Sequence, residues 1–175
     1  MKEQFNLKKM VLTALFTALT CIATMLIQIQ MPATQGYVNL GDCFVLLGAW
    51  VLGPIYGAFA GGVGSALADA LAGYMHYVPG TLVIKALMAV IAALLFRAFG
   101  KKNAYLGQLV GGVAAELWMV LGYFIYAWLI LGKGLAAAAS IPGNLLQGAV
   151  GIVAAIALVV ALRESKTLDK VNSNG

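Results

Sequence analysis

The most constraining feature of this sequence is a series of long apolar stretches that contain almost no charged residues. Of its 175 residues, 62% are hydrophobic and only 10% are charged. A soluble domain of this length carries about a quarter charged residues. So short a chain cannot fold that much apolar surface inward, and lipid has to cover it. The sequence therefore predicts an all-α membrane protein whose residues 1–175 form a single membrane-embedded domain.

Turn residues divide the apolar sequence into six predicted transmembrane helices. They cover residues 8–30, 41–53, 55–73, 80–98, 104–131 and 144–163. A span needs about 20 residues, so the second helix is short. Asp42 at its start is either its N-cap or part of a binding site. We expect the first stretch to be retained rather than cleaved as a signal peptide, because no convincing small-residue cleavage site follows it.

Basic residues mark the ends of the apolar stretches and explain the formal net charge of +5. An even number of spans places both termini on one side, and the positive-inside rule makes that side the cytoplasm. The basic residues predicted to face inward are Lys2, Lys8, Lys9, Arg97, Lys101, Lys102, Arg163, Lys166 and Lys170, whereas Lys133 lies in an outer loop. This distribution is a topology signal and not a phosphate-binding patch, so no nucleic-acid partner is expected.

The sequence lacks the motifs of the common enzyme and pump classes. It has no GxxxxGK[ST] phosphate loop and no HExxH, and His76 is its only histidine. Cys21 and Cys43 form no CxxC pair. We expect no metal and no cofactor, and transport must draw on a gradient or a partner. An acid–base enzyme would have to use Asp69 and Glu116, which lie at different predicted depths with no nucleophile beside them.

Ionisable residues inside the predicted spans are costly in lipid, so they are usually paired or functional. Asp69 and Lys85 each lie about one helical turn below the outer surface, where they form a structural ion pair, contact a ligand, or both. Glu116 lies deeper and begins a stripe at helical spacing that either packs or lines a site. The stripe continues through Met119, Tyr123 and Tyr126.

Asn144 and Gln147 lie at i and i+3 near the outer end of the last predicted helix, where they bridge helices or bind a solute. Polar groups from several helices thus gather in the outer half of the membrane. We expect a pocket open to the outside with an aromatic and hydrogen-bonding lining. The candidate substrate-binding residues are Asn39, Asp69, Lys85, Glu116, Tyr123, Tyr126, Asn144 and Gln147.

Small residues at a spacing of four suggest two smooth helix faces. Gly57, Gly61, Ser65, Asp69 and Gly73 form one ridge, which predicts close helix contact. Ala14 and Ala18 form a shorter one near the cytoplasmic end of the first predicted helix. They either pack inside the protein or offer a flat docking surface to another membrane protein.

Several segments of the chain resemble the substrate-binding S components of energy-coupling factor (ECF) vitamin transporters. They are Ala14-Leu-Phe-Thr-Ala18, Tyr37-Val-Asn-Leu-Gly-Asp42, Leu47-Gly-Ala-Trp-Val-Leu-Gly-Pro54, Gly61-Gly-Val-Gly-Ser-Ala-Leu-Ala-Asp69 and Ser140-Ile-Pro-Gly-Asn-Leu-Leu-Gln147. The resemblance extends over nearly the whole chain. It implies a multi-pass protein of the bacterial plasma membrane that has no ATPase of its own. Such a protein captures a small water-soluble vitamin from outside the cell for ATP-driven import.

The resemblance also implies roles for particular residues. In this family the AxxxA face of the first helix docks on a transmembrane coupling protein driven by two cytoplasmic ATPases, and Ala14 and Ala18 match that motif. Residues 32–40 would form a lid over the substrate, and the S component would topple in the membrane to release it.

The similarity is greatest to members for riboflavin, hydroxymethylpyrimidine or pyridoxine-like vitamins. A one-ring pyrimidine or pyridine is favoured, because aromatic faces stack on rings while Asp, Glu or Asn bind ring nitrogens and hydroxymethyl groups. The alternative is a self-sufficient proton-coupled carrier in which Glu116 titrates.

Overall fold

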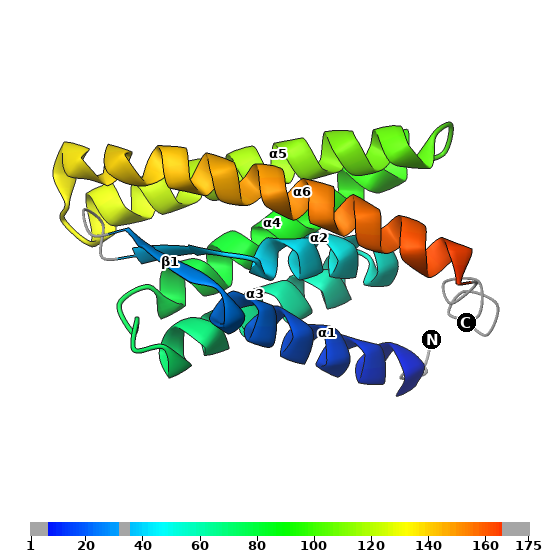
Figure 1. The fold of residues 1–175 in the computed structure, drawn as a ribbon, viewed down its shortest axis with the longest axis horizontal. Helices are drawn as coiled ribbons and strands as arrows, with labels where there is room; N and C mark the ends of the chain where they lie inside the picture. Colours follow the sequence, from blue (N-terminus) through cyan, green and yellow to red (C-terminus); the bar gives the residue numbers. More distant parts are fainter. Residues whose placement is uncertain (1–6, 32–35, 166–175) are drawn as a thin grey trace, which may run out of the picture.

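The computed structural model describes residues 7–31 and 36–165, which form six α-helices and one β-hairpin (Figure 1). The helices are α1 (Leu7–Leu26), α2 (Gly41–Leu52), α3 (Pro54–Leu71), α4 (Val78–Phe99), α5 (Ala104–Ile125) and α6 (Ile141–Glu164). The hairpin consists of β1 (Gln28–Met31) and β2 (Gly36–Asn39). A π-helical segment, η1 (Tyr126–Ile130), extends α5, and a 3-10 helix, η2 (Gly134–Ser140), leads into α6. The number of α-helices agrees with the sequence prediction.

Within the described ranges, four segments are long and apolar enough to cross a membrane. They are Leu7–Leu26, Val78–Phe99, Ala104–Ile130 and Gly134–Glu164. The short helix α2 lies in the interior instead, and ten of its 12 residues are buried. A helix that is apolar on all sides is stable when other helices surround it, so α2 needs no full membrane-spanning length.

Glycines allow α3 to pack closely against its neighbours. A Cβ atom at Gly57 would lie 2.8 Å from Ala49 Cα of α2, and one at Gly61 would lie 2.9 Å from Val45 Cγ1. The predicted small-residue ridge is therefore confirmed for these two positions. Gly73 is different, because it lies beyond the helix at φ 85° with nothing near its Cβ position. It serves the turn that follows α3 rather than helix packing.

The bundle has two chemically different ends. Figure 1 shows the start of α1 and the end of α6 at one end, and the hairpin and the α3–α4 turn at the other. Basic residues gather at the first end, in the first turn of α1, the last turns of α4 and α6, and the α4–α5 turn. They are Lys8, Lys9, Arg97, Lys101, Lys102 and Arg163.

The hairpin corrects the prediction that residues 8–30 form one helix. Helix α1 ends at Leu26, and Gln28 pairs with Asn39 and Met31 with Gly36 in antiparallel strands. Glutamine alternates with apolar residues from Gln28 to Met31, which is the period of a strand and not of a helix. Residues 32–35 of the predicted lid lie outside the described residues, while residues 36–40 belong to β2 and the link to α2.

Other boundaries shift by a few residues. Helix α4 begins at Val78 rather than residue 80, and α6 begins at Ile141 rather than 144, each with a proline in its first turn. Proline fits that position because its missing N–H would have no helical partner there. The predicted fifth helix stops being α-helical at Ile125, where the π-helical segment takes over.

For two charged residues the structure excludes one of the alternatives that the sequence left open. Asp42 is not an N-cap, since Leu40 holds that position and no side chain caps the helix. The carboxylate of Asp42 instead points into the bundle and forms an ion pair with Lys85. Lys85 therefore has Asp42 as its partner and not Asp69, which accepts a hydrogen bond from Tyr37.

Candidate binding pocket

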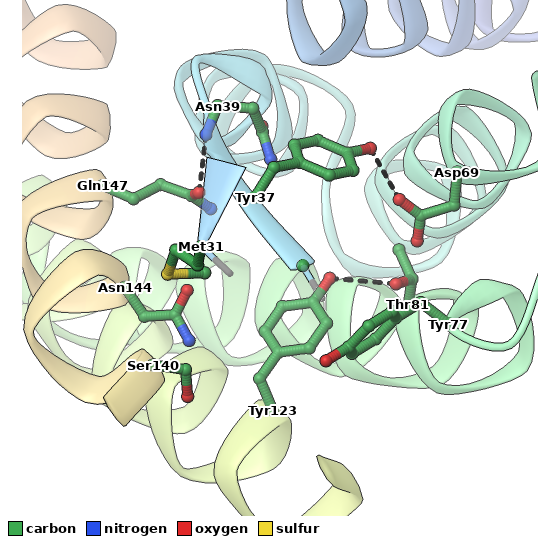
Figure 2. A pocket seen from close by; sticks show the side chains of 11 residues that line it. Met31, Tyr37, Asn39, Asp69, Tyr77, Thr81, Tyr123, Ser140, Asn144 and Gln147 are labelled. Atoms are coloured by element: carbon green, nitrogen blue, oxygen red, sulfur yellow. Dashed lines mark hydrogen bonds between the residues drawn. The ribbon is translucent and has the colours of Figure 1, made fainter. Parts of the chain in front are cut away.

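A pocket lies at the hairpin end of the bundle, where five parts of the chain meet. The hairpin, α3, the start of α4, α5 and the start of α6 all contribute side chains to it (Figure 2). The lining residues are Met31, Gly36, Tyr37, Asn39, Asp69, Tyr77, Thr81, Tyr123, Ser140, Asn144 and Gln147.

The hairpin is tied to α3 across the pocket. The hydroxyl of Tyr37 donates a hydrogen bond of 2.6 Å to Asp69 Oδ1. Burial and the negative charge of Asp69 raise the pKa of Tyr37 well above its ordinary value, so the phenol stays protonated and remains a donor. The Tyr37 ring also packs on Tyr74, with ring centroids 4.8 Å apart. These contacts fix one aromatic face and one carboxylate on the same side of the pocket.

The opposite wall is built from α4 and α5. The hydroxyl of Tyr123 donates to Thr81 Oγ1 at 3.1 Å, and the ring of Tyr123 meets Tyr77 edge to face with centroids 6.3 Å apart. Tyr126 is not among the lining residues, and its hydroxyl donates to the carbonyl oxygen of His76. Its ring also packs closely on Gly80 of α4. Tyr123 therefore lines the pocket, while Tyr126 anchors the turn before α4.

Helix α6 supplies the amide side chains. Gln147 is fully engaged, because its Oε1 accepts the backbone N–H of Asn39 at 2.8 Å and its Nε2 donates to Asp42 Oδ2 at 2.6 Å. The Ser140 hydroxyl donates to the carbonyl oxygen of Ala137. Asn144 differs, since its side chain makes no hydrogen bond to any residue that the structure describes and points into the pocket in Figure 2. Asn144 thus offers a donor and an acceptor to a solute.

The structure brings together five of the eight residues predicted from the sequence, namely Asn39, Asp69, Tyr123, Asn144 and Gln147. The other three, Lys85, Glu116 and Tyr126, are not among the lining residues. Lys85 is only 2% exposed and lies with its Nζ 5.5 Å from the centre of the Tyr123 ring, where it is paired with Asp42. Glu116 is buried between α5 and α6.

Sequence reasoning missed six residues of the lining: Met31, Gly36, Tyr37, Tyr77, Thr81 and Ser140. Tyr37 and Tyr77 lie in stretches that were expected to be outer loops, so their aromatic character was the available signal. Thr81 lies four residues before Lys85, on the same helix face. Met31 and Gly36 could not be placed without the strand pairing that joins them.

The described residues contain no group of three or more His, Cys, Asp or Glu side chains arranged to hold a metal ion. The pocket instead combines three tyrosine rings with one carboxylate and side-chain amides. Rings of this kind stack on flat solutes, while the carboxylate and amides select hydrogen-bonding groups at their edges. The arrangement is suited to reversible binding of a small polar ring.

Comparisons with known proteins agree with this description. Residues 4–164 match the family model described as ECF-type riboflavin transporter, S component. A Pyrococcus woesei protein described as "Uncharacterized protein in gap 3'region" is 42% identical over 133 residues, which is 75% of this chain and 86% of that protein. The thiamine precursor transporter HmpT of Lactococcus lactis subsp. cremoris is 32% identical over 151 residues, or 86% of this chain and 84% of that protein.

A solved structure also shares the fold. It is described as the S component of a bacterial ECF transporter and superimposes with a TM-score of 0.66 at 18% sequence identity, covering 90% of this chain and 96% of the other. At that identity the likeness concerns the fold alone. The family model, however, spans almost all of the sequence, including every residue of the pocket. The chain therefore belongs to the ECF-type riboflavin transporter S component family and is a multi-pass membrane protein of that class.

Proposed function

We propose that this S component captures a one-ring vitamin or vitamin precursor, of the hydroxymethylpyrimidine or pyridoxine type, for ATP-driven import. The observation that carries the proposal is the pocket under the hairpin. There the unpaired amide of Asn144 and the carboxylate of Asp69 lie among three tyrosine rings. A flat heterocycle with a ring nitrogen and a hydroxymethyl or amino group uses all of these groups at once.

The pairing of solute and pocket can be assigned group by group. A tyrosine face stacks on the ring, and the Asn144 amide meets a ring nitrogen and a neighbouring donor. Asp69 accepts the Tyr37 hydroxyl on Oδ1 and also has a side-chain hydrogen bond with Thr81, and its carboxylate retains lone pairs that can accept a hydroxymethyl or amino hydrogen. The name of the relative HmpT, a thiamine precursor transporter, supports a pyrimidine.

Riboflavin is the second candidate solute, because the matching family model carries that name. Riboflavin brings three fused rings and a ribityl chain, which demand a larger space than a single ring does. The two candidates predict opposite orders of affinity. A one-ring site binds hydroxymethylpyrimidine or pyridoxine more tightly than riboflavin, and a flavin site reverses that order.

The proposal includes an energising partner that docks on α1. Ala14 and Ala18 are exposed, and together with Thr17, Ile22 and Phe59 they border a shallow apolar hollow between α1 and α3. A flat surface of small residues permits close approach of another helix in a membrane. We infer that a transmembrane coupling protein, driven by two cytoplasmic ATPases, occupies this hollow.

The inferred orientation places the pocket outside the cell and both termini in the cytoplasm of a bacterial cell. The support is the gathering of basic residues at the end of the bundle opposite the pocket, as the positive-inside rule requires. The whole chain then works as one membrane-embedded binding domain, with the hairpin as the cover of its outer pocket.

Uptake by proteoliposomes tests this function. We expect labelled hydroxymethylpyrimidine or pyridoxine to enter vesicles that contain the chain together with the coupling protein and both ATPases, and only when ATP is supplied. Vesicles with the chain alone and an imposed proton gradient serve as the control. Accumulation in those control vesicles would contradict ECF-dependent import and favour a self-sufficient carrier.

A further inference from the structure

Beneath the pocket floor lies a cluster of three ionisable residues from three helices. Lys85 of α4 forms an ion pair with Asp42 of α2. Glu116 of α5 lies beside them, since Asp42 and Glu116 both contact Gly151 of α6. A Cβ atom added at Gly151 would lie 3.0 Å from Asp42 Cβ and 3.1 Å from Glu116 Oε1. All three side chains belong to buried residues, with exposures of 0% for Asp42, 2% for Lys85 and 5% for Glu116.

The three residues differ in how well their charges are compensated. Asp42 receives the Lys85 ammonium on one oxygen and the Gln147 amide on the other. Glu116 has no such support, since both of its oxygens are buried and neither has a hydrogen-bond partner in the described part of the chain. A buried carboxylate without donors is strongly disfavoured in its ionised form.

Apolar side chains line the groove beside Glu116. Its side chain lies in the seam between α5 and α6, at the base of a groove with apolar walls such as Leu117, Leu145 and Ile152. That groove faces outward from a helix pair of a membrane protein, so lipid chains adjoin it. If both carboxyl groups were ionised, the cluster would carry one net negative charge in this medium, and a single bound proton makes it neutral.

We propose that Asp42, Lys85 and Glu116 form a buried binding site for one proton. The proton lies between the two carboxyl groups and is bound to Glu116. Asp42 is the ionised partner of Lys85, and Glu116 is a neutral carboxylic acid at physiological pH. The proton thus completes the charge balance that lets α2, α4, α5 and α6 pack together below the pocket. The inference stands whichever solute the pocket takes.

Other titratable groups face the cluster and have to be distinguished from it. They are Cys43 on α2, Asp69 on α3 and Tyr123 on α5. Helix α6 contributes only Gln147 and glycines to this face. Asp69 is the group most easily confused with Glu116, but it lines the open pocket and accepts the Tyr37 hydroxyl. An Asp69→Asn variant therefore serves as the control.

Gln147 connects the proton site to the cover of the pocket. Its Nε2 donates to Asp42 while its Oε1 holds the backbone of Asn39 in β2. Loss of the proton would place a second negative charge beside Asp42 and make it compete for Lys85. The link from α2 through α6 to the hairpin would then loosen, so the site sets the position of the hairpin through Gln147.

Infrared spectroscopy of the full chain in lipid nanodiscs at neutral pH detects the proton directly. A protonated carboxyl group absorbs apart from ionised carboxylates, and its band shifts when the sample is exchanged into deuterium oxide. We expect wild type and Asp69→Asn to share a carboxylic-acid component that Glu116→Gln lacks. A wild-type spectrum without a carboxylic-acid band, or an unchanged band in Glu116→Gln, would overturn the proposal.

Charge-count variants provide a second, independent test. Asp42→Asn and Glu116→Gln are each expected to keep the yield of folded protein within about twofold of wild type, because the remaining carboxyl group can ionise and neutralise Lys85. The double variant leaves the ammonium unpaired and should lose about tenfold in folded yield. Adding Lys85→Met should restore that yield. A double variant that folds as well as the single ones would contradict a shared proton.

Discussion

Asn144 is the residue on which solute recognition most depends. It projects into the pocket from the first turn of α6, and the structure describes no partner for its amide. Neighbouring polar groups are already engaged, as Ser140 is with the carbonyl oxygen of Ala137. An amide that is left unpaired in a polar pocket acquires its partner from the solute.

Replacement of Asn144 by alanine should therefore weaken solute binding without unfolding the protein. The expected loss is about 1–3 kcal/mol, or roughly 5- to 150-fold in Kd, because one solute group loses its partner. Calorimetric titration measures this loss. Ser140→Ala is the matched control, since the Ser140 hydroxyl already donates to the carbonyl oxygen of Ala137. This variant should change Kd far less. Equal effects of the two variants would remove Asn144 from its proposed role.

Tyr37 closes the pocket from the side of the hairpin, and its removal tests that closure. Tyr37→Phe deletes the hydrogen bond to Asp69 and leaves the carboxylate with one donor fewer. A hydrogen bond to a charged group contributes about 1.5–3 kcal/mol, so Kd should rise by roughly tenfold or more. The control is Tyr74→Phe, because the Tyr74 hydroxyl donates to Gln30 Oε1 at an exposed position. Hydrogen exchange of β2 should increase in Tyr37→Phe, and an unchanged rate would argue against a closing role.

At the scale of elements, the sequence predicts helices well and the hairpin poorly. Long uncharged stretches and prolines locate the helices to within a few residues, because length and apolar character are dictated by the membrane. The hairpin depends on pairing between Gln28 and Asn39. The sequence prediction places Gln28 in the first helix and Asn39 in the lid segment that follows it. The alternation from Gln28 to Met31 signals an extended strand, but it does not reveal which segment that strand pairs with.

The charged residues show the same limit at the level of helix contacts. Depth along each span correctly suggests that Lys85 needs an acidic partner, yet it cannot choose between Asp42 and Asp69. The choice depends on the short helix α2 lying in the interior, where Asp42 faces α4. Similarly, the five predicted pocket residues lie near the ends of their elements on the hairpin side of the bundle, whereas Glu116 belongs to a different, deeper site.

The exposed face of α1 makes a prediction about partner binding. Ala14→Trp or Ala18→Trp fills the apolar hollow between α1 and α3 and should abolish co-purification with the coupling protein. Solute binding should persist, because the hollow and the pocket share no lining residue. Leu15→Trp is the control, since Leu15 is also exposed on α1 but does not border the hollow. Normal complex formation by the alanine variants would exclude this docking surface.

At the scale of the whole molecule, three functional regions lie apart from one another. The pocket occupies the hairpin end, the basic residues occupy the opposite end, and the hollow on α1 lies along the flank. The glycine contacts of α3 and the interior helix α2 hold these regions in one tightly packed bundle. This division suits a binding subunit that captures a solute on one side of the membrane and leaves energy conversion to its partners.

Calorimetric titration of the purified chain in lipid nanodiscs with hydroxymethylpyrimidine, pyridoxine, thiamine and riboflavin tests solute capture most directly. We expect hydroxymethylpyrimidine or pyridoxine to bind one-to-one with a Kd of about 1 μM or lower, and more tightly than riboflavin. Tighter binding of riboflavin would contradict the one-ring assignment. Absence of binding by all four compounds, with the protein demonstrably folded, would contradict vitamin capture itself.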